Sequence, residues 1–158
     1  MHNREIARQL QRLHDLVQKS GEATAGAIEL QSQWAKYICV LSAGLLENAI
    51  KEIYIEYAQN QVSRPIANFI STLLSPIRNP KSQRFLEIAA AFNPDWKDEL
   101  ESYLNDDGRG DAVDSIMNHR HLIAHGKSHN SNISLVQIKD YLAKAQQVLE
   151  FIEKQCKR

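Results

Sequence analysis

Residues 111–126 read DAVDSIMNHRHLIAHG, and their spacing is typical of an amphipathic helix. Five polar side chains recur along one stripe at steps of three, four, three and four: Asp111, Asp114, Asn118, His121 and His125. The opposite side is apolar and consists of Ala112, Val113, Ile116, Met117, Ile123 and Ala124. Asp111 is a good N-cap and Gly126 a good C-terminal stop, so we expect a helix over residues 112–125.

Arg120 stands in the angular middle of the apolar side of this helix. A guanidinium buried without a partner is very costly, so Arg120 must either reach solvent or meet an acceptor. One interpretation is a structural salt bridge to Glu47 or Glu52 on the long helix predicted below. The other is that its N–H donors bind an anion such as a phosphate. The two interpretations are compatible with each other.

His125 lies in the last turn of the predicted helix, where the helix dipole favours the imidazolium form. That place suits a general acid or base, although capping of the last carbonyls is the simpler interpretation for a single histidine. His121 and His125 are spaced to share a metal ion, but the segment lacks the glutamate of the His-Glu-x-x-His zinc motif. Neither His119 nor His129 supplies an evident third ligand. We therefore expect no metal and no other cofactor.

Helical spacing also marks the first third of the chain. An amphipathic helix is predicted near the N-terminus by Ile6, Leu10, Leu13 and Val17. Ser20-Gly21 interrupts it, and a longer helix is predicted from about residue 23 to residue 59. The middle of that helix, residues 37–46, is apolar on all sides. We expect it at the centre of a bundle, covered by neighbours, with Gly44 allowing another helix to approach closely.

Four prolines divide the middle third into short helices, predicted over residues 66–74, 82–92 and 95–104. Asn93 before Pro94 is a plausible cap for the last of these. Residues 105–110 and 127–132 are predicted loops.

A final helix is predicted to begin at Ser134. It carries apolar residues at helical spacing: Leu135, Ile138, Leu142, Ala145, Leu149 and Ile152. No segment shows the sustained alternation of a strand. The prediction is an all-α fold with a four-helix up-and-down core and short helices in the middle third.

The composition indicates one globular domain over residues 1–158, with 43% hydrophobic and 24% charged residues. Nineteen basic residues balance nineteen acidic ones, so any contact with RNA must come from a local site. Cys39 and Cys156 are too far apart in sequence to suggest a disulfide framework. The longest apolar run, residues 37–46, is too short to span a bilayer, and no signal-like segment is seen, so we expect a cytoplasmic location.

Arg120, a polar residue, three further residues, His125 and Gly126 resemble the signature of HEPN domains, which are helical bundles. Residues 118–126 match it at each key position, with His121 as the polar residue after the arginine. Residues 39–48, followed by Glu52 and Tyr57-Ala58, are similar to the central helix of the RiboL-PSP-HEPN branch. The likeness covers most of the chain and is least clear in the proline-rich middle third.

The resemblance implies a homodimer in which two such helices meet and two Arg/His pairs line one cleft. Active members cleave RNA without metal, by attack of the ribose 2′-hydroxyl, and leave a 2′,3′-cyclic phosphate. Carried onto this chain, His125 transfers the proton, Arg120 stabilises the phosphorane charge and His121 assists in positioning. Glu47 would orient Arg120 or a histidine, and Asn118 is the other supporting residue. A twofold axis would supply both the base and the acid that in-line attack requires.

The leading hypothesis is an endoribonuclease that acts on RNA as a toxin, a defence effector or an RNA-processing factor, with an antitoxin or another protein partner. The alternative is a catalytically inactive HEPN module that binds RNA, a nucleotide or a protein. A third hypothesis is a purely structural dimerisation domain, in which the histidines would face solvent away from the dimer contact.

Overall fold

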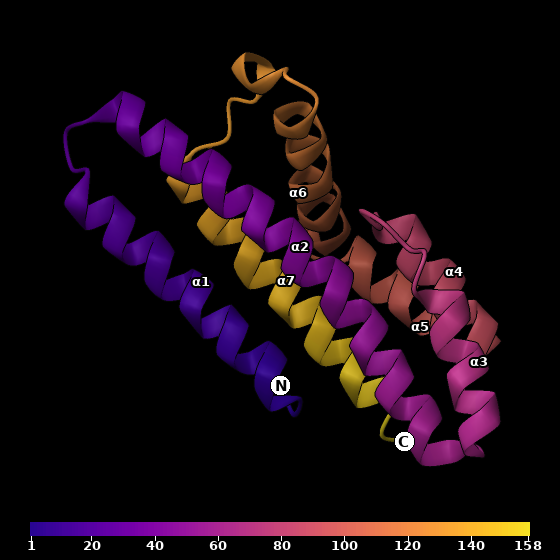
Figure 1. The fold of residues 1–158 in the computed structure, drawn as a ribbon. Helices are drawn as coiled ribbons and strands as arrows, with labels where there is room; N and C mark the ends of the chain where they lie inside the picture. Colours follow the sequence, from indigo (N-terminus) through magenta and orange to yellow (C-terminus); the bar gives the residue numbers. More distant parts are fainter.

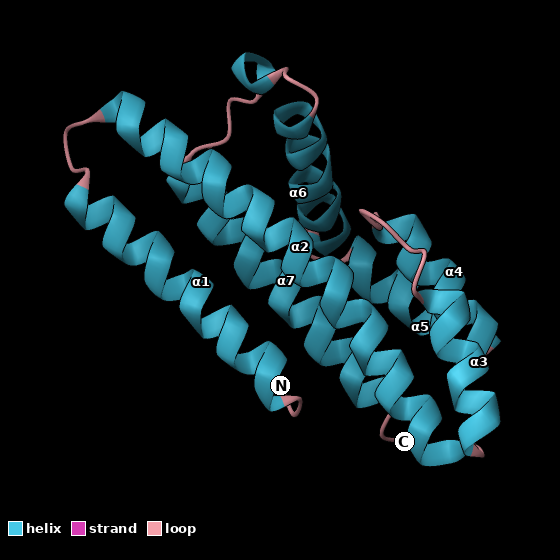
Figure 2. Ribbon diagram, in the orientation of Figure 1, coloured by secondary structure: helices cyan, strands magenta, loops and turns pink.

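The computed structural model describes all 158 residues and contains helices but no strands, as the spacing predicts (Figures 1 and 2). The elements in chain order are α1 (Arg4–Ala23), α2 (Ile28–Gln61), α3 (Arg64–Leu74), α4 (Ser82–Phe92), α5 (Pro94–Asn105), α6 (Arg109–Ala124), the short 3₁₀ helix η1 (Ser128–Asn130) and α7 (Leu135–Gln155). The expected all-α class is therefore confirmed.

Four helices, α1, α2, α6 and α7, run alternately up and down and form the core (Figure 1). Helix α2 is central because it packs against α1, α6 and α7, and its C-terminal half also contacts α3. The largest fully buried side chains are Ile38, Leu46, Ile50, Tyr54, Phe85, Leu100, Ile116, Met117, Ile133, Ile138, Leu142 and Leu149. Burial of one such apolar side chain contributes roughly 1.5–3 kcal/mol. Since Phe85 and Leu100 come from α4 and α5, the middle third shares the same core.

The predicted interruption at Ser20-Gly21 is wrong, because α1 continues to Ala23. Buried hydroxyls support its last turns: Ser20 Oγ donates to the carbonyl of Val17 at 3.1 Å, and Thr24 Oγ1 donates to that of Ser20 at 2.6 Å. The turn to α2 occurs at Gly26, whose φ of 81° suits glycine.

The predicted start of α6 is also wrong. The helix begins at Arg109, and its N-cap is Gly108 with a left-handed φ of 64°, so Asp111 lies in the first turn. Arg109 supports this early start by donating to the Asp106 carboxylate at 2.7 Å. This contact lengthens α6 by about one turn at its N-terminus, and a prediction that looks only for N-cap residues misses it.

The predicted end of α6 and the caps of two other helices are confirmed. Gly126 has a φ of 71°, and the N–H of Lys127 donates to the carbonyl of Leu122 at 2.9 Å, which closes α6 in a Schellman-type turn. Asn93 accepts a hydrogen bond from the N–H of Asp95 at the start of α5. Ser134 and Gln137 form a capping box at the start of α7.

Helix α2 is not covered on all sides, which corrects the expectation for residues 37–46. We name its uncovered apolar side the α2 stripe, formed by Leu30, Trp34, Tyr37, Val40 and Leu41 with Gly44. Tyr37 is 53% exposed, and no atom lies within 4 Å of a Cβ built on Gly44. The neighbouring helices cover the other sides of α2 and leave this one open. No helix in the structure combines the length and hydropathy that crossing a membrane requires.

Candidate functional site

The C-terminal turns of α6 present the two histidines of the predicted site at the surface. His121 and His125 are exposed, and their ring centroids lie 4.3 Å apart with an interplanar angle of 47°. His125 is the C-cap residue, and its backbone N–H donates to the carbonyl of His121 at 3.1 Å. Neither ring has a hydrogen bond to another side chain. The structure thus brings the two imidazoles together and leaves their nitrogens available to a ligand.

Arg120 is half-buried, and its guanidinium forms no ion pair or hydrogen bond within the chain. Its backbone is held against α2: the Cys39 thiol donates to the carbonyl of Ile116 at 3.4 Å, and the N–H of Arg120 approaches the same sulfur. Burial raises the pKa of Cys39 to about 12, and the contact with the Arg120 N–H opposes that rise only in part. The salt bridge to Glu47 or Glu52 that the sequence left open is not formed.

Glu47, on α2, has partners other than Arg120. Its carboxylate accepts hydrogen bonds from Lys51 Nζ at 3.2 Å and from the backbone N–H of Asn79 at 2.8 Å, and the Arg78 guanidinium lies 3.6 Å away. Burial raises the pKa of Glu47, but these hydrogen bonds and the two cations lower it more, so the net pKa lies below its ordinary value. Within one chain, Glu47 therefore anchors the loop between α3 and α4, and it does not contact Arg120.

The polar stripe of α6 is divided between two tasks. Asp114 accepts hydrogen bonds from the N–H of Ser82 at 2.7 Å and from its hydroxyl at 3.0 Å, and so caps the start of α4. Asn118, one turn further along, is exposed and makes no hydrogen bond through its side chain. The first part of the stripe therefore serves the fold, and the part from Asn118 to His125 is free to meet a ligand.

His119 does not join the histidine pair. Its Nδ1 lies 2.9 Å from the hydroxyl of Ser131, which ties the loop after η1 to α6. Desolvation lowers the pKa of His119 below its ordinary value. Nowhere do three or more His, Cys, Asp or Glu side chains form a group able to hold a metal ion. The chemistry that one chain offers at this place is proton transfer by imidazole and binding of an anion by a guanidinium.

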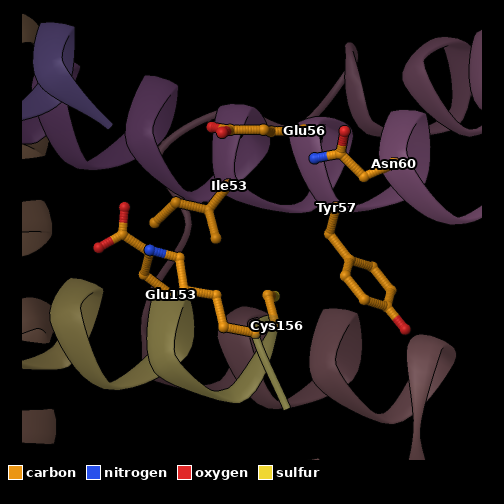
Figure 3. Close-up of a pocket in the computed structure, with 7 residues that line it drawn as sticks. Ile53, Glu56, Tyr57, Asn60, Glu153 and Cys156 are labelled. Carbon is orange, nitrogen blue, oxygen red and sulfur yellow. The ribbon is translucent and has the colours of Figure 1, made fainter. Parts of the chain in front are cut away.

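A hollow at the opposite end of α2 carries no comparable chemistry (Figure 3). Ile53, Glu56, Tyr57 and Asn60 on α2 face Glu153 and Cys156 at the end of α7. The Glu153 carboxylate is already occupied, since it accepts the backbone N–H of His2 at 2.6 Å and that of Asn3 at 2.7 Å. Glu153 thus holds the first residues of the chain against the end of α7.

Comparison with known proteins places the chain in a family. The family model described as RiboL-PSP-HEPN matches residues 2–158. The chain belongs to the RiboL-PSP-HEPN family. The resemblance predicted from the Arg120–Gly126 segment and the central helix is thereby confirmed. No curated protein and no solved structure matches the chain significantly.

Family membership supports a HEPN-type nuclease or RNA-binding module in general terms. The roles of individual site residues stay predictions. Two contacts beside the site were not predicted: the pairing of Glu47 with Lys51 and the contact of Cys39 with α6. The spacing of Glu47 and Lys51, four residues apart on a helix, was a usable signal for the first, whereas the second depends on how α2 and α6 cross.

Proposed function

We propose that this chain is a metal-independent endoribonuclease of the HEPN type that acts as a homodimer, with Arg120, His121 and His125 of each copy lining one cleft. The observation that carries the proposal is the exposed pair of His121 and His125 at the end of α6, which has no side-chain partner in the chain, together with an Arg120 on the same helix whose guanidinium is also unpaired. Membership of the RiboL-PSP-HEPN family supports it. Its cellular role would be that of a toxin, a defence effector or an RNA-processing factor.

In the proposed reaction the ribose 2′-hydroxyl attacks the adjacent phosphorus while His125 of one copy removes its proton. The bond from phosphorus to the 5′-oxygen breaks, and His125 of the other copy protonates that oxygen. The products are a 2′,3′-cyclic phosphate and a 5′-hydroxyl. Arg120 stabilises the negative charge of the phosphorane, and His121 positions the phosphate.

The α2 stripe supports the dimer in this proposal. Because His121 positions the phosphate in this reaction, each chain supplies one proton-transfer group, His125, and the acid and the base come from different copies. Tyr37, Val40 and Leu41 of the stripe are exposed apolar side chains that a second copy would cover. Gly44 adds support, since a glycine inside a helix costs about 1 kcal/mol relative to alanine and no helix of the chain uses its open surface.

The test is cleavage of a panel of structured and single-stranded RNAs in EDTA, with the termini of the products identified chemically. The proposal expects 2′,3′-cyclic phosphate ends from the wild-type protein and none from the Arg120→Ala/His125→Ala double variant. Sedimentation of wild type and Leu41→Glu tests the dimer, because a carboxylate on the α2 stripe should separate the copies. Cleavage equal to that of the double variant on every RNA would overturn the catalytic proposal.

A second candidate is a non-catalytic module that binds RNA or a nucleotide. It is favoured by one observation: no side chain orients either imidazole, whereas a catalytic histidine is commonly held by a third group. This candidate predicts that RNA binds, that Arg120→Ala weakens the binding and that the RNA is recovered intact after long incubation.

A further inference from the structure

Lys127 is the first residue beyond the Gly126 turn that ends α6, two positions after His125. Its backbone is fixed on both sides: its N–H donates to the carbonyl of Leu122 at 2.9 Å, and its carbonyl accepts the N–H of Asn130 at 2.9 Å. Its side chain is exposed and forms no ion pair. A free cation thus extends from a fixed point of the backbone close to the histidine pair.

The end of α6 is rich in basic groups although the chain is neutral overall. Residues 115–139 contain no aspartate or glutamate, but they contain three lysines and arginines and four histidines. Of the two carboxylates on α6, Asp114 is held by Ser82, and Asp111 lies in the first turn, at the other end of the helix. No carboxylate of α6 therefore competes with an anionic ligand for Lys127.

The position of Lys127 at a helix C-terminus bears on anion binding. The last carbonyls of a helix carry partial negative charge, which disfavours a phosphate there unless a cation is present. Arg120 is half-buried, and the five residues from Arg120 to His125 turn the helix by about 140°, so Arg120 faces another side. Lys127 is the free cation nearest along the chain to His125, and it can offset the negative helix end.

We propose that Lys127 binds the RNA phosphate next to the one that is cleaved, and so positions the strand against His121 and His125. That RNA is the ligand rests on the proposed function. A lysine suits this task because its ammonium binds a phosphate as a point charge and tolerates the varied geometry of a flexible strand. Lys127 is a positioning residue, so it should affect the affinity for RNA and leave the chemical step nearly unchanged.

An acidic protein segment fits this surface less well. Interfaces between proteins are apolar and aromatic at their centre, and none of the exposed large apolar side chains lies between residues 109 and 134. The exposed side chains beside Lys127 are polar instead: Asn118, His121, His125 and His129. They are hydrogen-bonding groups that suit phosphates and bases.

The experiment measures how the affinity for RNA depends on salt. The probe is a fluorescent 12-nucleotide RNA of mixed sequence with 2′-O-methyl groups, which keeps the phosphates but cannot be cleaved by a 2′-hydroxyl. Each phosphate contact contributes roughly 0.7 to the slope of log affinity against log salt. Lys127→Ala should therefore lower that slope by about 0.7 and weaken binding roughly fivefold to tenfold at about 50 mM KCl. Lys127→Arg should restore both.

Lys154→Ala is the matched control. Lys154 is exposed and unpaired, and it lies near the end of α7, at the opposite end of the molecule from η1 (Figure 1). This variant removes the same charge and should keep the wild-type slope. Alanine at position 127 retains both backbone hydrogen bonds, and thermal unfolding verifies that it folds. Lys127→Gln is the second variant if it does not.

Three results would overturn the proposal: no binding of the probe by the wild type at low salt, an unchanged slope in Lys127→Ala, or an equal change in Lys154→Ala. Poly-glutamate provides the protein arm, and binding of it that Lys127→Ala abolishes, with RNA binding unchanged, also overturns the proposal.

Cleavage of unmodified RNA is a separate readout. Where it occurs, Lys127→Ala should raise KM at least about threefold and change kcat by less than about twofold, since uniform binding is lost. A fall in kcat alone would overturn the positioning role. A wild type that binds the probe through Lys127 but cleaves no RNA would overturn the nuclease proposal and support the assignment of Lys127.

Discussion

Two sets of polar side chains, one around Glu47 of α2 and one in the last turns of α6, differ in whether their members have partners. In the first, Glu47 is bound by Lys51, Arg78 and the backbone of Asn79, all within 3.6 Å. In the second, Arg120 and the pair His121 and His125 make no ion pair or side-chain hydrogen bond. The first cluster is used by the fold, and the second is available for binding.

Exposure explains why the fold tolerates the two histidines without partners. The side chains of Glu47 and Lys51 are only 17% and 12% exposed, so each needs the other to offset the loss of water. The two histidines are exposed and remain hydrated without a partner. Substitutions around Glu47 should therefore lower stability, whereas substitutions of Arg120 and the histidines should lower activity.

The largest effect is expected at the second cluster. Each of these two groups takes part in the proposed reaction, so Arg120→Ala and His125→Ala should each lower the rate of RNA cleavage at least about 100-fold. Since neither side chain has a partner in the chain, the two variants should unfold at nearly the same temperature as the wild type. A lower melting temperature for Arg120→Ala alone would reveal a buried partner and contradict the comparison.

Glu47→Ala should lower the free energy of unfolding by about 1–3 kcal/mol, because Lys51 and the N–H of Asn79 lose their acceptor. Cleavage per folded molecule should be retained. Denaturant titration measures the first and a single-turnover assay the second, with the exposed Glu52→Ala as control. Loss of cleavage with unchanged stability would instead support the role that the HEPN resemblance gives Glu47, the orientation of Arg120 or a histidine.

The polar stripe of α6 permits a finer comparison. Asp114→Ala removes both hydrogen bonds to Ser82 and should cost about 1–2 kcal/mol of stability. Asn118→Ala, one turn away, should change stability by no more than about 0.5 kcal/mol. Thermal unfolding of the two variants checks the difference. Equal destabilisation would show that Asn118 supports the fold as much as Asp114 does.

The smallest effect concerns pH. The pKa of His119 is lowered in the folded chain from its ordinary value of 6.5, so the unfolded chain takes up this proton first as the pH falls. Stability from this group is present above pH 6.5 and is lost as the pH falls through the lowered pKa. His119→Gln should flatten the decline of stability in that window, and His129→Gln, on the exposed side of η1, is the control. An unchanged profile in His119→Gln would contradict the assignment.

The sequence predicts this fold best where the signal is contained within one helical turn. The Ser134 capping box, the Asn93 cap and the Gly126 stop need only neighbouring residues, and all three are present. The failures have two origins. Side-chain contacts within one turn, which no cap pattern signals, carry α1 past Gly21 and start α6 at Arg109, and the arrangement of neighbouring helices leaves the α2 stripe open.

The same limit applies to the candidate site. Periodicity shows that Arg120 is out of place on an apolar side, but the identity of its partners cannot be predicted from spacing. The loop after α3 brings Arg78 and Asn79 to Glu47. The carboxylate that the sequence analysis considered as a partner for Arg120 therefore binds these two residues instead. That outcome depends on the path of a loop rather than on any helix.

The burial of Cys39 against α6 gives a way to measure local opening of the structure beside Arg120. A thiol that is fully buried and whose pKa is near 12 reacts hardly at all with alkylating reagents at neutral pH. Its modification requires α2 and α6 to part beside Arg120, so the rate of labelling reports how often that seam opens. Under the proposed function, RNA bound beside Arg120 should slow this labelling, so the labelling rate of the native Cys39 would measure occupancy without an introduced cysteine.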